Sequence, residues 1–435
     1  MVLWFLLLIG VMIIIHELGH YWAARWFDIR VDTFSFGFGP RLLGFKKGET
    51  DFRVSLIPFG GYVRMAGEQP GDANADDPRS FQAKPRWQRL IVVFGGPFMN
   101  IVLAVTILAG LFMYRYPKPT PQAVSGIVGV VLPDSAAARA GIQEGDRITA
   151  LDGVQYPSWE DIMLKVLGNP GQPLRLAYDR GGVEKETTLV PEMDKRDGIG
   201  TAGWGEQMEI QIGGVQAGMD AERKGMRAGD LLVSINGEPV RSTMKIRESV
   251  KKSEGKPVEI TFRRDGKDQT VAVVPAQGDL EGQRSWMIGV QLEPRFVFVQ
   301  LGPIEALRES IKSNVKSAGL IYQFLHGIVE RRMSPRSLEG PIRMAQISGE
   351  AAKEGVSSYL GLMAMVSLNL AIFNLLPIPI LDGGSILLLL VEMIFRRDLS
   401  LQVKETVLKF GFVFLLMVVM FVLYNDIRKV LPIGG

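Results

Sequence analysis

The sequence has no cysteine and only three histidines among its 435 residues. Without cysteine the chain can form no disulfide bond, no thiolate metal site and no cysteine nucleophile. An excess of one charge is missing too, because 49 basic and 46 acidic residues leave a formal net charge of only +3. Basic and aromatic residues do not gather into a common patch, so we expect no nucleic-acid partner.

Long apolar runs, in contrast, are abundant, and 47% of the residues are hydrophobic. Crossing about 30 Å of hydrocarbon takes roughly 20 helical residues. Runs of that length lie at approximately 2–24, 90–113, 357–381 and 405–424. The first run has no basic residue before it and no clear small-residue cleavage site, which favours a retained helix over a signal peptide. We therefore predict a polytopic α-helical membrane protein with four transmembrane helices in a lipid bilayer.

The connection between the first two runs is rich in basic residues. Cytoplasmic loops carry such an excess, so we expect this connection in the cytoplasm and the long middle segment on the outer, periplasmic side. The short link between the last two runs agrees, with Arg396, Arg397, Lys404 and Lys409. The basic residues of the first connection include Arg30, Arg41, Lys46, Lys47, Arg53 and Arg64.

Two of the three histidines stand in the first apolar run, in the sequence HELGH. Residues four apart lie on one face of a helix, so His16 and His20 can present two imidazoles to one zinc ion. Glu17 is then placed to take a proton from the attacking water. Such side chains are costly in hydrocarbon, which favours a metal site over a structural role. His326 lies in a segment of soluble composition and is expected to be an ordinary structural or surface residue.

A catalytic zinc site needs a third protein ligand, and NLLPIPILDGG at 374–384 offers one. Pro377 and Pro379 break the helix before Asp382, which frees backbone groups and turns the carboxylate inward. Asn374, upstream on the same segment, could donate a hydrogen bond to a peptide carbonyl or a developing oxyanion. Taken alone, Asp382 would be a cap or turn residue before the next helix. Paired with HELGH, it is better explained as a ligand.

The middle segment contains an internal repeat with a constant offset of 84 residues. ARAGIQEGDRITALDG at 138–153 corresponds to ERKGMRAGDLLVSING at 222–237, and a predicted hairpin follows each copy. The pattern resembles PDZ domains, which implies two α+β PDZ-like domains at 123–192 and 208–277. They could contact peptides or other domains, or serve only as spacers and shields. Neither copy has a clear carboxylate-binding glycine loop, so capture of a terminal carboxylate is not expected.

Five elements, in order HELGH, GFGP, GGPFMN, the two PDZ-like copies and NLLPIPILDGG, together resemble the site-2 protease family over almost the whole chain. The resemblance implies an intramembrane zinc protease of the bacterial cytoplasmic (inner) membrane that cleaves single-span proteins already trimmed outside. An anti-sigma factor or remnant signal peptides would be substrates of this kind. The family's zinc ligands correspond to His16, His20 and Asp382, its catalytic glutamate to Glu17, and its substrate-positioning asparagine to Asn374.

The stretch TDFRVSLIPFGGYVRMAGE alternates as two strands would, Phe52–Ile57 and Tyr62–Met65, around Pro58 and Gly60-Gly61. A protease must hold its substrate extended, and exposed backbone in lipid must be paired. An open edge of this hairpin, at 52–57, could add the substrate as a further strand. The alternative is an ordinary cytoplasmic hairpin on the membrane surface. The predicted substrate-binding residues are Asn374, Arg53, Val54, Ser55, Leu56, Ile57, Pro58, Gly60, Gly61 and Tyr62.

Residues 303–330 have the spacing of an amphipathic helix that lies along the outer surface or packs on the PDZ-like pair. Its apolar face comprises Ile304, Leu307, Ile311, Val315, Ala318 and Leu325. A loop at 334–344 then leads toward the membrane. The predicted division of the chain is a first transmembrane helix at 1–26, a membrane-associated β region at 27–89, a second helix at 90–114, PDZ-like domains at 123–192 and 208–277, an amphipathic helix with its connection at 302–356, a third helix at 357–383 and a fourth at 405–425.

The sequence thus predicts a zinc endopeptidase that hydrolyses peptide bonds in or near transmembrane segments, with its site toward the cytoplasm. If the first helix enters from outside near Val2, His16 lies about 21 Å along the axis, immersed yet within reach of cytoplasmic water. Two alternatives are a membrane-anchored PDZ scaffold with a vestigial metal site and a surface zinc peptidase acting on soluble peptides. The intact HELGH and the distant carboxylate argue against the first, and the depth argues against the second.

Overall fold

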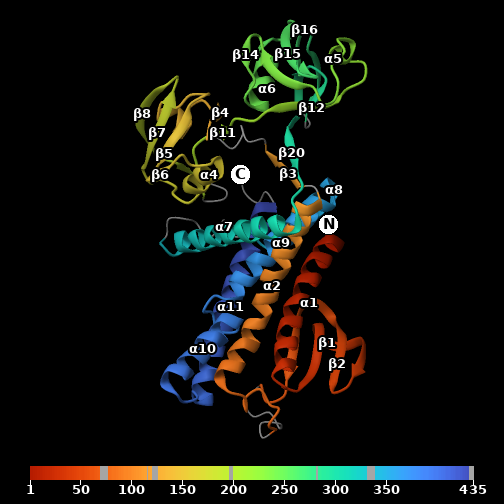
Figure 1. The fold of residues 1–435 in the computed structure, drawn as a ribbon, viewed down its shortest axis with the longest axis vertical. Helices are drawn as coiled ribbons and strands as arrows, with labels where there is room; N and C mark the ends of the chain where they lie inside the picture. Colours follow the sequence, from red (N-terminus) through yellow and green to blue (C-terminus); the bar gives the residue numbers. More distant parts are fainter. Residues whose placement is uncertain are drawn as a thin grey trace. The chain divides into compact units, whose positions relative to one another are not determined.

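The computed structural model describes residues 1–68, 77–114, 116–119, 126–194, 199–280, 283–330 and 339–430. The chain divides into two compact units, whose elements are labelled in Figure 1. The mainly helical unit contains the apolar runs, and the other unit contains the internal repeat. The helical unit comprises Met1–Tyr116, Gln300–Gln323 and Leu338–Gly435, and the other comprises Pro117–Val299 and Phe324–Ser337.

Four helices of the described chain are long and apolar enough to cross a membrane. Each coincides with an apolar run of the sequence, and the predicted polytopic helical fold is confirmed. Helix α2 packs against both α1 and α9. The four are α1 (Val2–Trp26), α2 (Arg86–Tyr114), α9 (Val356–Asn374) and, for most of its length, α11 (Leu401–Val430).

Helices α1 and α2 come into backbone contact at a pair of glycines. A Cβ atom on Gly19 would lie 2.1 Å from the carbonyl oxygen of Gly95, and one on Gly95 would lie 2.6 Å from that of Gly19. Any larger residue at either position would push the helices apart, because real Cβ atoms do not approach so closely. This contact brings HELGH directly against GGPFMN.

The sequence predicted a single helix over 357–383 for the third apolar run. The structure corrects this prediction, because the run is divided between two helices. Helix α9 ends at Asn374, and after a short loop a separate helix, α10 (Asp382–Phe395), begins. Pro377 and Pro379 lie in this loop and account for the predicted break. With 14 residues, α10 is too short to span a bilayer alone, so the search for long runs missed it.

The loop before α10 folds back tightly on the start of that helix. A Cβ atom on Gly383 would lie 2.2 Å from the carbonyl oxygen of Leu376, and one on Gly384 would lie 2.4 Å from that of Ile378. Ile380 adopts a φ of +87°, in the region that favours glycine. The two glycines after Asp382 therefore allow the loop to fix the position of the first residue of α10.

A buried ionic cluster holds the other end of α10. Glu392 is 1% exposed and accepts from Lys404 Nζ of α11 at 2.7 Å and from the backbone N–H of Leu399 at 3.0 Å. Arg89 at the start of α2 lies 4.0 Å from the second carboxylate oxygen. The cluster ties α10 to α2 and α11, so α10 is fixed at both ends.

Strands β1 (Val31–Lys47) and β2 (Thr50–Met65) form one irregular antiparallel sheet. Phe52 is paired on both sides, with Phe34 and with Phe45, and Val54 is likewise paired with Phe36 and Leu43. The segment 50–57 is therefore an inner strand, flanked by 31–38 and 41–47. Residues 61–65 pair with 31–36, on the side away from 50–57.

This pairing corrects two parts of the predicted hairpin. The segments 52–57 and 62–65 do not pair with each other, because the segment 31–36 lies between them. The open edge is also not at 52–57, since both sides of that segment are occupied. Alternation along 50–68 alone could not reveal this, because the flanking strands come from upstream sequence. Ile29, Val31, Val63 and Met65 pack with Ala24 of α1 and anchor the sheet to that helix.

The first PDZ-like copy is built on a four-stranded sheet in the order β6-β5-β7-β8. Its core contains Ile148 of β5, Leu176 of β7 and Ile162 of α4. Ala202 and Trp204, which lie beyond the predicted boundary at 192, also pack in this core. Its elements are β4 (Val128–Val131), α3 (Ala136–Arg139), β5 (Arg147–Leu151), β6 (Val154–Gln155), α4 (Trp159–Leu167), β7 (Leu174–Arg180), β8 (Val183–Leu189), β9 (Glu192–Met193), β10 (Gly200–Thr201) and β11 (Trp204–Glu206).

The second copy has the strand order β16-β15-β13-β12-β19, with β14 paired to β13. Ile288, beyond the predicted boundary at 277, belongs to its core. Its elements are β12 (Ile210–Val215), α5 (Asp220–Arg223), β13 (Leu231–Ile235), β14 (Glu238–Pro239), α6 (Thr243–Lys252), β15 (Val258–Arg264), β16 (Lys267–Val273), β17 (Ala276–Leu280), β18 (Gln283–Met287) and β19 (Val290–Pro294). Strands β3 (Tyr116–Pro119) and β20 (Phe296–Val299) pair with each other.

Both copies thus extend beyond the ranges predicted at 123–192 and 208–277. In each, the last strand pairs with the first strand of its own copy: β11 with β4, and β19 with β12. A short hairpin, β9–β10 or β17–β18, separates that last strand from the repeated motif. The repeat alignment ended at the hairpin and therefore missed the returning strand.

The repeat is also visible in one ion pair per copy. Arg180 donates two hydrogen bonds of 2.7 Å to the buried Asp146, and Arg264 donates two of 2.6 Å to the buried Asp230. Asp146 and Asp230 are 84 residues apart, and so are Arg180 and Arg264, which is the offset of the repeat. The aspartate raises the pKa of the paired arginine through these bonds. Sequence analysis found the aspartates but not their partners.

Helix α7 (Pro303–Val329) occupies the predicted amphipathic segment. Within the helical unit, Ser310 of α7 donates to the carbonyl oxygen of Val105 of α2 at 2.7 Å. The predicted apolar face is outward: Ile304 is 80% and Val315 66% exposed.

A further helix, α8 (Pro341–Glu354), was not predicted. Residues 334–338 of the loop predicted at 334–344 lie outside the described residues, and residues 341–344 belong to α8 rather than to a loop. Asp426 of α11 accepts hydrogen bonds of 2.8 to 3.2 Å from the backbone N–H groups of Gly340, Ile342 and Arg343. The carboxylate thereby satisfies the free donors at the helix start.

Candidate metal centre

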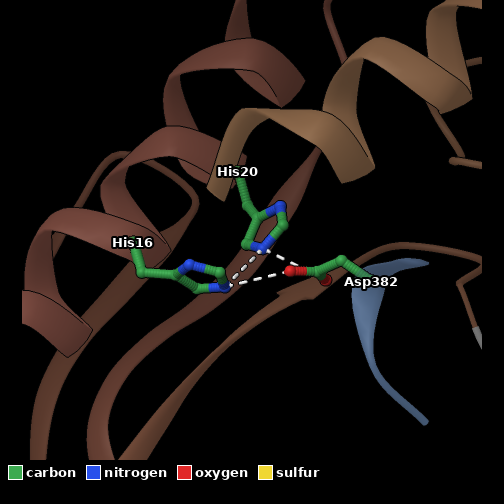
Figure 2. Close-up of side chains that lie close together, drawn as sticks. All are labelled: His16, His20 and Asp382. Atoms are coloured by element: carbon green, nitrogen blue, oxygen red, sulfur yellow. Dashed lines mark hydrogen bonds and ion pairs between the residues drawn. The ribbon is translucent and has the colours of Figure 1, made fainter. Parts of the chain in front are cut away.

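Helix α1 and the start of α10 bring three ligand-type side chains together (Figure 2). Asp382 Oδ2 lies 3.1 Å from His16 Nε2, and Asp382 Oδ1 lies 3.5 Å from His20 Nε2. The two Nε2 atoms are 3.2 Å apart. One atom from each residue lies within 4.8 Å of the others, so the three side chains point to a common centre.

The donor set fits a zinc ion. Two imidazole nitrogens and one carboxylate are a common catalytic ligand set, which leaves a fourth position open. His20 Nδ1 lies 2.9 Å from the carbonyl oxygen of Val92, so this nitrogen carries the proton and Nε2 is free to bind a metal. The two Nε2 atoms face each other, an arrangement that a shared cation stabilises.

Helix α2 leaves space for the imidazoles through a glycine. A Cβ atom on Gly96 would lie 2.3 Å from His20 Nε2 and 2.7 Å from His16 Nε2. Any side chain here would enter the centre of the cluster. Gly96 therefore forms the floor of the candidate metal centre.

Glu17 lies between the three-residue cluster and the sheet. It follows His16 on α1 and is only partly buried. A Cβ atom on Gly61 would lie 3.1 Å from Glu17 Cγ, so the glutamate side chain contacts the strand segment that begins at Gly61. A carboxylate in this position can exchange protons with a molecule held between the metal ligands and the sheet.

The structure places Asn374 at the last position of α9, before the loop that leads to Asp382. It is partly buried. Among the described residues, no hydrogen bond joins it to His16, His20 or Asp382. Its predicted part in substrate positioning remains a prediction.

Of the substrate-binding residues predicted in β2, Gly61 lies beside Glu17. Ser55 is buried, with its hydroxyl 2.9 Å from that of Ser35. Arg53 donates to the Tyr62 hydroxyl, and the Tyr62 ring stacks on Phe38. The side chains of Val54, Leu56 and Ile57 are 40% to 55% exposed, Gly60 lies against the Phe38 ring, and the side chain of Pro58 lies outside the described part of the chain.

The contribution of α2 to the site was not predicted. Val92, Gly96 and Asn100 are spaced by four residues, and all three face the histidines. The available signal was Asn100, a polar residue in an apolar run, within the quoted sequence GGPFMN. Its partner could not be read from spacing, because helix α1 is remote in sequence.

The HELGH sequence on one membrane-length helix, with a distant aspartate in contact with its two histidines, defines a membrane zinc metalloprotease. The chain belongs to peptidase family M50, whose model matches residues 4–418. This match confirms the predicted family, and with it the peptidase activity.

Relatives of known name cover the whole chain. The "Regulator of sigma-E protease RseP" of Salmonella typhimurium is 30% identical over 446 residues, with 98% of each chain covered. A "Putative zinc metalloprotease" of Vibrio cholerae is 28% identical over 447 residues, also with 98% of each chain covered. The name of the Vibrio cholerae relative supports the predicted zinc cofactor. The PDZ domain of the SdrC-like protein from Listeria monocytogenes is 24% identical, covers 20% of this chain and 92% of that one, and has a TM-score of 0.17.

Proposed function

We propose that this chain is an intramembrane endopeptidase that cleaves single-span membrane proteins in or near their transmembrane segments. His16, His20 and Asp382 are the zinc ligands, Glu17 is the general base, and Asn374 contacts the substrate carbonyl. The observation that carries the proposal is the convergence of His16 and His20 with Asp382, which come from different helices.

Zinc held by these three side chains would supply a Lewis acid that polarises the scissile carbonyl and lowers the pKa of the attacking water. Glu17 accepts a proton from this water as its oxygen bonds to the carbonyl carbon. The carbon–nitrogen bond then breaks, and Glu17 returns the proton to the departing nitrogen. The Asn374 amide donates to the carbonyl oxygen, which gains negative charge during the attack.

The substrate strand pairs with the edge at 61–65 rather than with 52–57. Residues 61–65 have one strand neighbour in the described sheet, whereas 50–57 has two. The contact between Gly61 and Glu17 supports this assignment, because a peptide along this edge would pass the base. Main-chain pairing of this kind recognises an extended backbone with little dependence on its side chains.

The site faces the cytoplasmic side of a bacterial inner membrane, and the PDZ-like copies face the periplasm. The basic connection after α1 supports this orientation through the positive-inside rule. The β1–β2 sheet, with Arg41, Lys46 and Lys47, follows the end of α1 that lies nearer to the histidines. The active site would then lie within the membrane, close to its cytoplasmic side.

The name of the Salmonella relative points to regulation of sigma-E. We extend this to the present chain: its substrates include an anti-sigma factor or remnant signal peptides, after a first cut outside. The PDZ-like copies either exclude substrates with bulky outer domains or recruit trimmed ones.

The second copy favours peptide contact. A cavity of about 590 Å³ lies between α6 and the edge strand β19, and Ile246, Val250 and Ile288 line it. Gly289, with a φ of +81°, lies at the start of this edge. Gly289 lies beyond the boundary predicted at 277, outside the second copy as the sequence defined it.

The proposal is tested by incubating the purified protein, reconstituted in lipid, with single-span membrane proteins and with soluble peptides, with and without a chelator. Product masses identify the cut bonds. Chelator-sensitive cuts in or near transmembrane segments are the expected result. Cleavage of the soluble peptides alone would support a surface peptidase, and absence of both zinc and cleavage would support a scaffold with a vestigial site.

A further inference from the structure

Asn100 of α2 is completely buried, and it touches one of the three metal-ligand candidates. Its side-chain amide nitrogen Nδ2 lies 3.2 Å from Nδ1 of His16. Its side-chain oxygen Oδ1 is also buried and has no hydrogen-bond partner. A buried amide without its full set of hydrogen bonds is costly, particularly inside an apolar helix. The position therefore requires an explanation.

The contact between Asn100 and His16 pairs two donors, and a rotation of the Asn100 side-chain amide removes this mismatch. His16 Nε2 faces Asp382 and His20, so Nε2 must keep its lone pair for a metal, and Nδ1 then carries the proton. An N–H of the amide cannot bond to an N–H of the ring. Turning the amide by 180° exchanges Nδ2 and Oδ1, places an acceptor against Nδ1–H, and gives the unpartnered oxygen its bond.

The other histidine shows the same arrangement without ambiguity. His20 Nδ1 lies 2.9 Å from the backbone carbonyl oxygen of Val92, an atom that can only accept. Val92 and Asn100 lie on the same face of α2, on either side of Gly96. One face of α2 thus supplies an acceptor to each imidazole. The Asn100 backbone is held in turn, because Ser367 of α9 donates to its carbonyl oxygen at 2.8 Å.

We propose that Asn100 is a positioning residue that accepts a hydrogen bond from His16 Nδ1 through Oδ1. The bond fixes the tautomer and the ring orientation of His16, so that Nε2 points at the metal centre. This inference rests on the proposed function, in which His16 is a zinc ligand. Partners of this kind commonly change metal affinity by roughly 10–100-fold.

The test compares Asn100→Leu with Asn100→Asp. Leucine removes the acceptor at similar volume, whereas aspartate has the shape of asparagine and can only accept when ionised. We expect Asn100→Leu to weaken zinc binding roughly 10–100-fold and Asn100→Asp to bind within a few-fold of the parent or more tightly. Zinc affinity is measured by competition with a chelator, and the absorption spectrum of the cobalt-loaded protein reports the ligand geometry.

Thr106→Val is the matched control, since Thr106 lies on α2, is exposed, and donates its hydroxyl to the carbonyl oxygen of Val102 on the same helix. Parent-like zinc affinity in Asn100→Leu would overturn the inference. Equal losses in the leucine and aspartate variants would also overturn it, since that result points to packing or to amide donation. Should Asn100→Leu fail to fold, the aspartate variant decides: weaker zinc binding or an altered cobalt spectrum contradicts an acceptor role.

His16→Ala separates this inference from the proposed function. If His16→Ala retains full zinc affinity, the ligand assignment itself fails. If His16→Ala loses zinc while Asn100→Leu keeps it, only the positioning role of Asn100 fails.

Discussion

Asp382 Oδ2 lies 3.1 Å from His16 Nε2, and this contact joins the first residue of α10 to the middle of α1. The sequence places these residues at opposite ends of the chain. The sheet, the two PDZ-like copies and α7 all lie between them in sequence. Zinc at this point would cross-link the helical unit as well as serve catalysis.

Chelation should therefore destabilise the parent protein but not Asp382→Ala. Removing zinc from the parent removes a ligand that binds the folded state, and we expect the melting temperature to fall by a few degrees. Asp382→Ala should melt at the chelated temperature with or without added zinc. Thermal unfolding of both proteins in detergent, with and without a chelator, measures the difference. A chelator-induced shift of equal size in the variant would remove Asp382 from the ligand set.

Gly96→Ala should abolish zinc binding, whereas Gly110→Ala should leave it unchanged. The new methyl group at position 96 would occupy the centre of the cluster, 2.3 Å from His20 Nε2. Gly110 belongs to the same helix, and a Cβ atom there meets no atom within 4 Å. Metal analysis of the two purified variants makes the comparison. Full zinc content in Gly96→Ala would show that the floor of the site is not where the geometry places it.

Proline on the strand edge at 61–65 should slow cleavage more than proline on the opposite edge. Tyr62→Pro distorts the strand segment that passes Glu17, whereas Leu43→Pro distorts the outer strand 41–47. Tyr62→Phe removes only the hydroxyl contact with Arg53 and should be milder. Cleavage rates are measured at matched zinc content, against a stable and a glycine-weakened substrate helix, and the weakened helix should be cut faster.

Equal cleavage by Tyr62→Pro and the parent would exclude this edge as the substrate clamp. A larger effect of Leu43→Pro would move the clamp to the other side of the sheet.

Deleting both PDZ-like copies should allow cleavage of untrimmed substrates while trimmed ones are still cut. The deletion must run from 120 to 295, because removal of 123–277 alone would leave β19 without its partner β12. Strands β3 and β20 pair directly and can be joined by a short linker. Loss of cleavage of trimmed substrates would instead identify the copies as recruiters. Ile246→Glu, in the cavity beside β19, would then be expected to reproduce that loss.

The sequence was sufficient for those features that are local or periodic. Four apolar runs predicted the four membrane-length helices, because hydrophobic length is a property of single segments. HELGH placed His16, Glu17 and His20 on one helical turn. Asp382 was predicted as a ligand from the proline break before it and from its combination with HELGH, and the family resemblance agreed, although no local pattern encodes its approach to the histidines.

Features that depend on distant partners were missed or misplaced. Strand 52–57 was expected at an edge, but 31–38 covers one side of it. The arginines that bond Asp146 and Asp230 lie 34 residues after them, beyond the repeated motif. No role was predicted for Asn100, because its partner His16 is on a different helix, α1. In each case the information lies in the tertiary arrangement rather than in spacing along the chain.

The most direct test of the account compares the parent with Glu17→Gln on one single-span substrate in lipid vesicles. Both proteins are first shown by metal analysis to carry the same amount of zinc. The account predicts that the parent cuts the substrate in or near its transmembrane segment, as mapped by fragment masses, and that Glu17→Gln cuts it at least about 100-fold more slowly. Cleavage by Glu17→Gln at the parent rate would contradict the account.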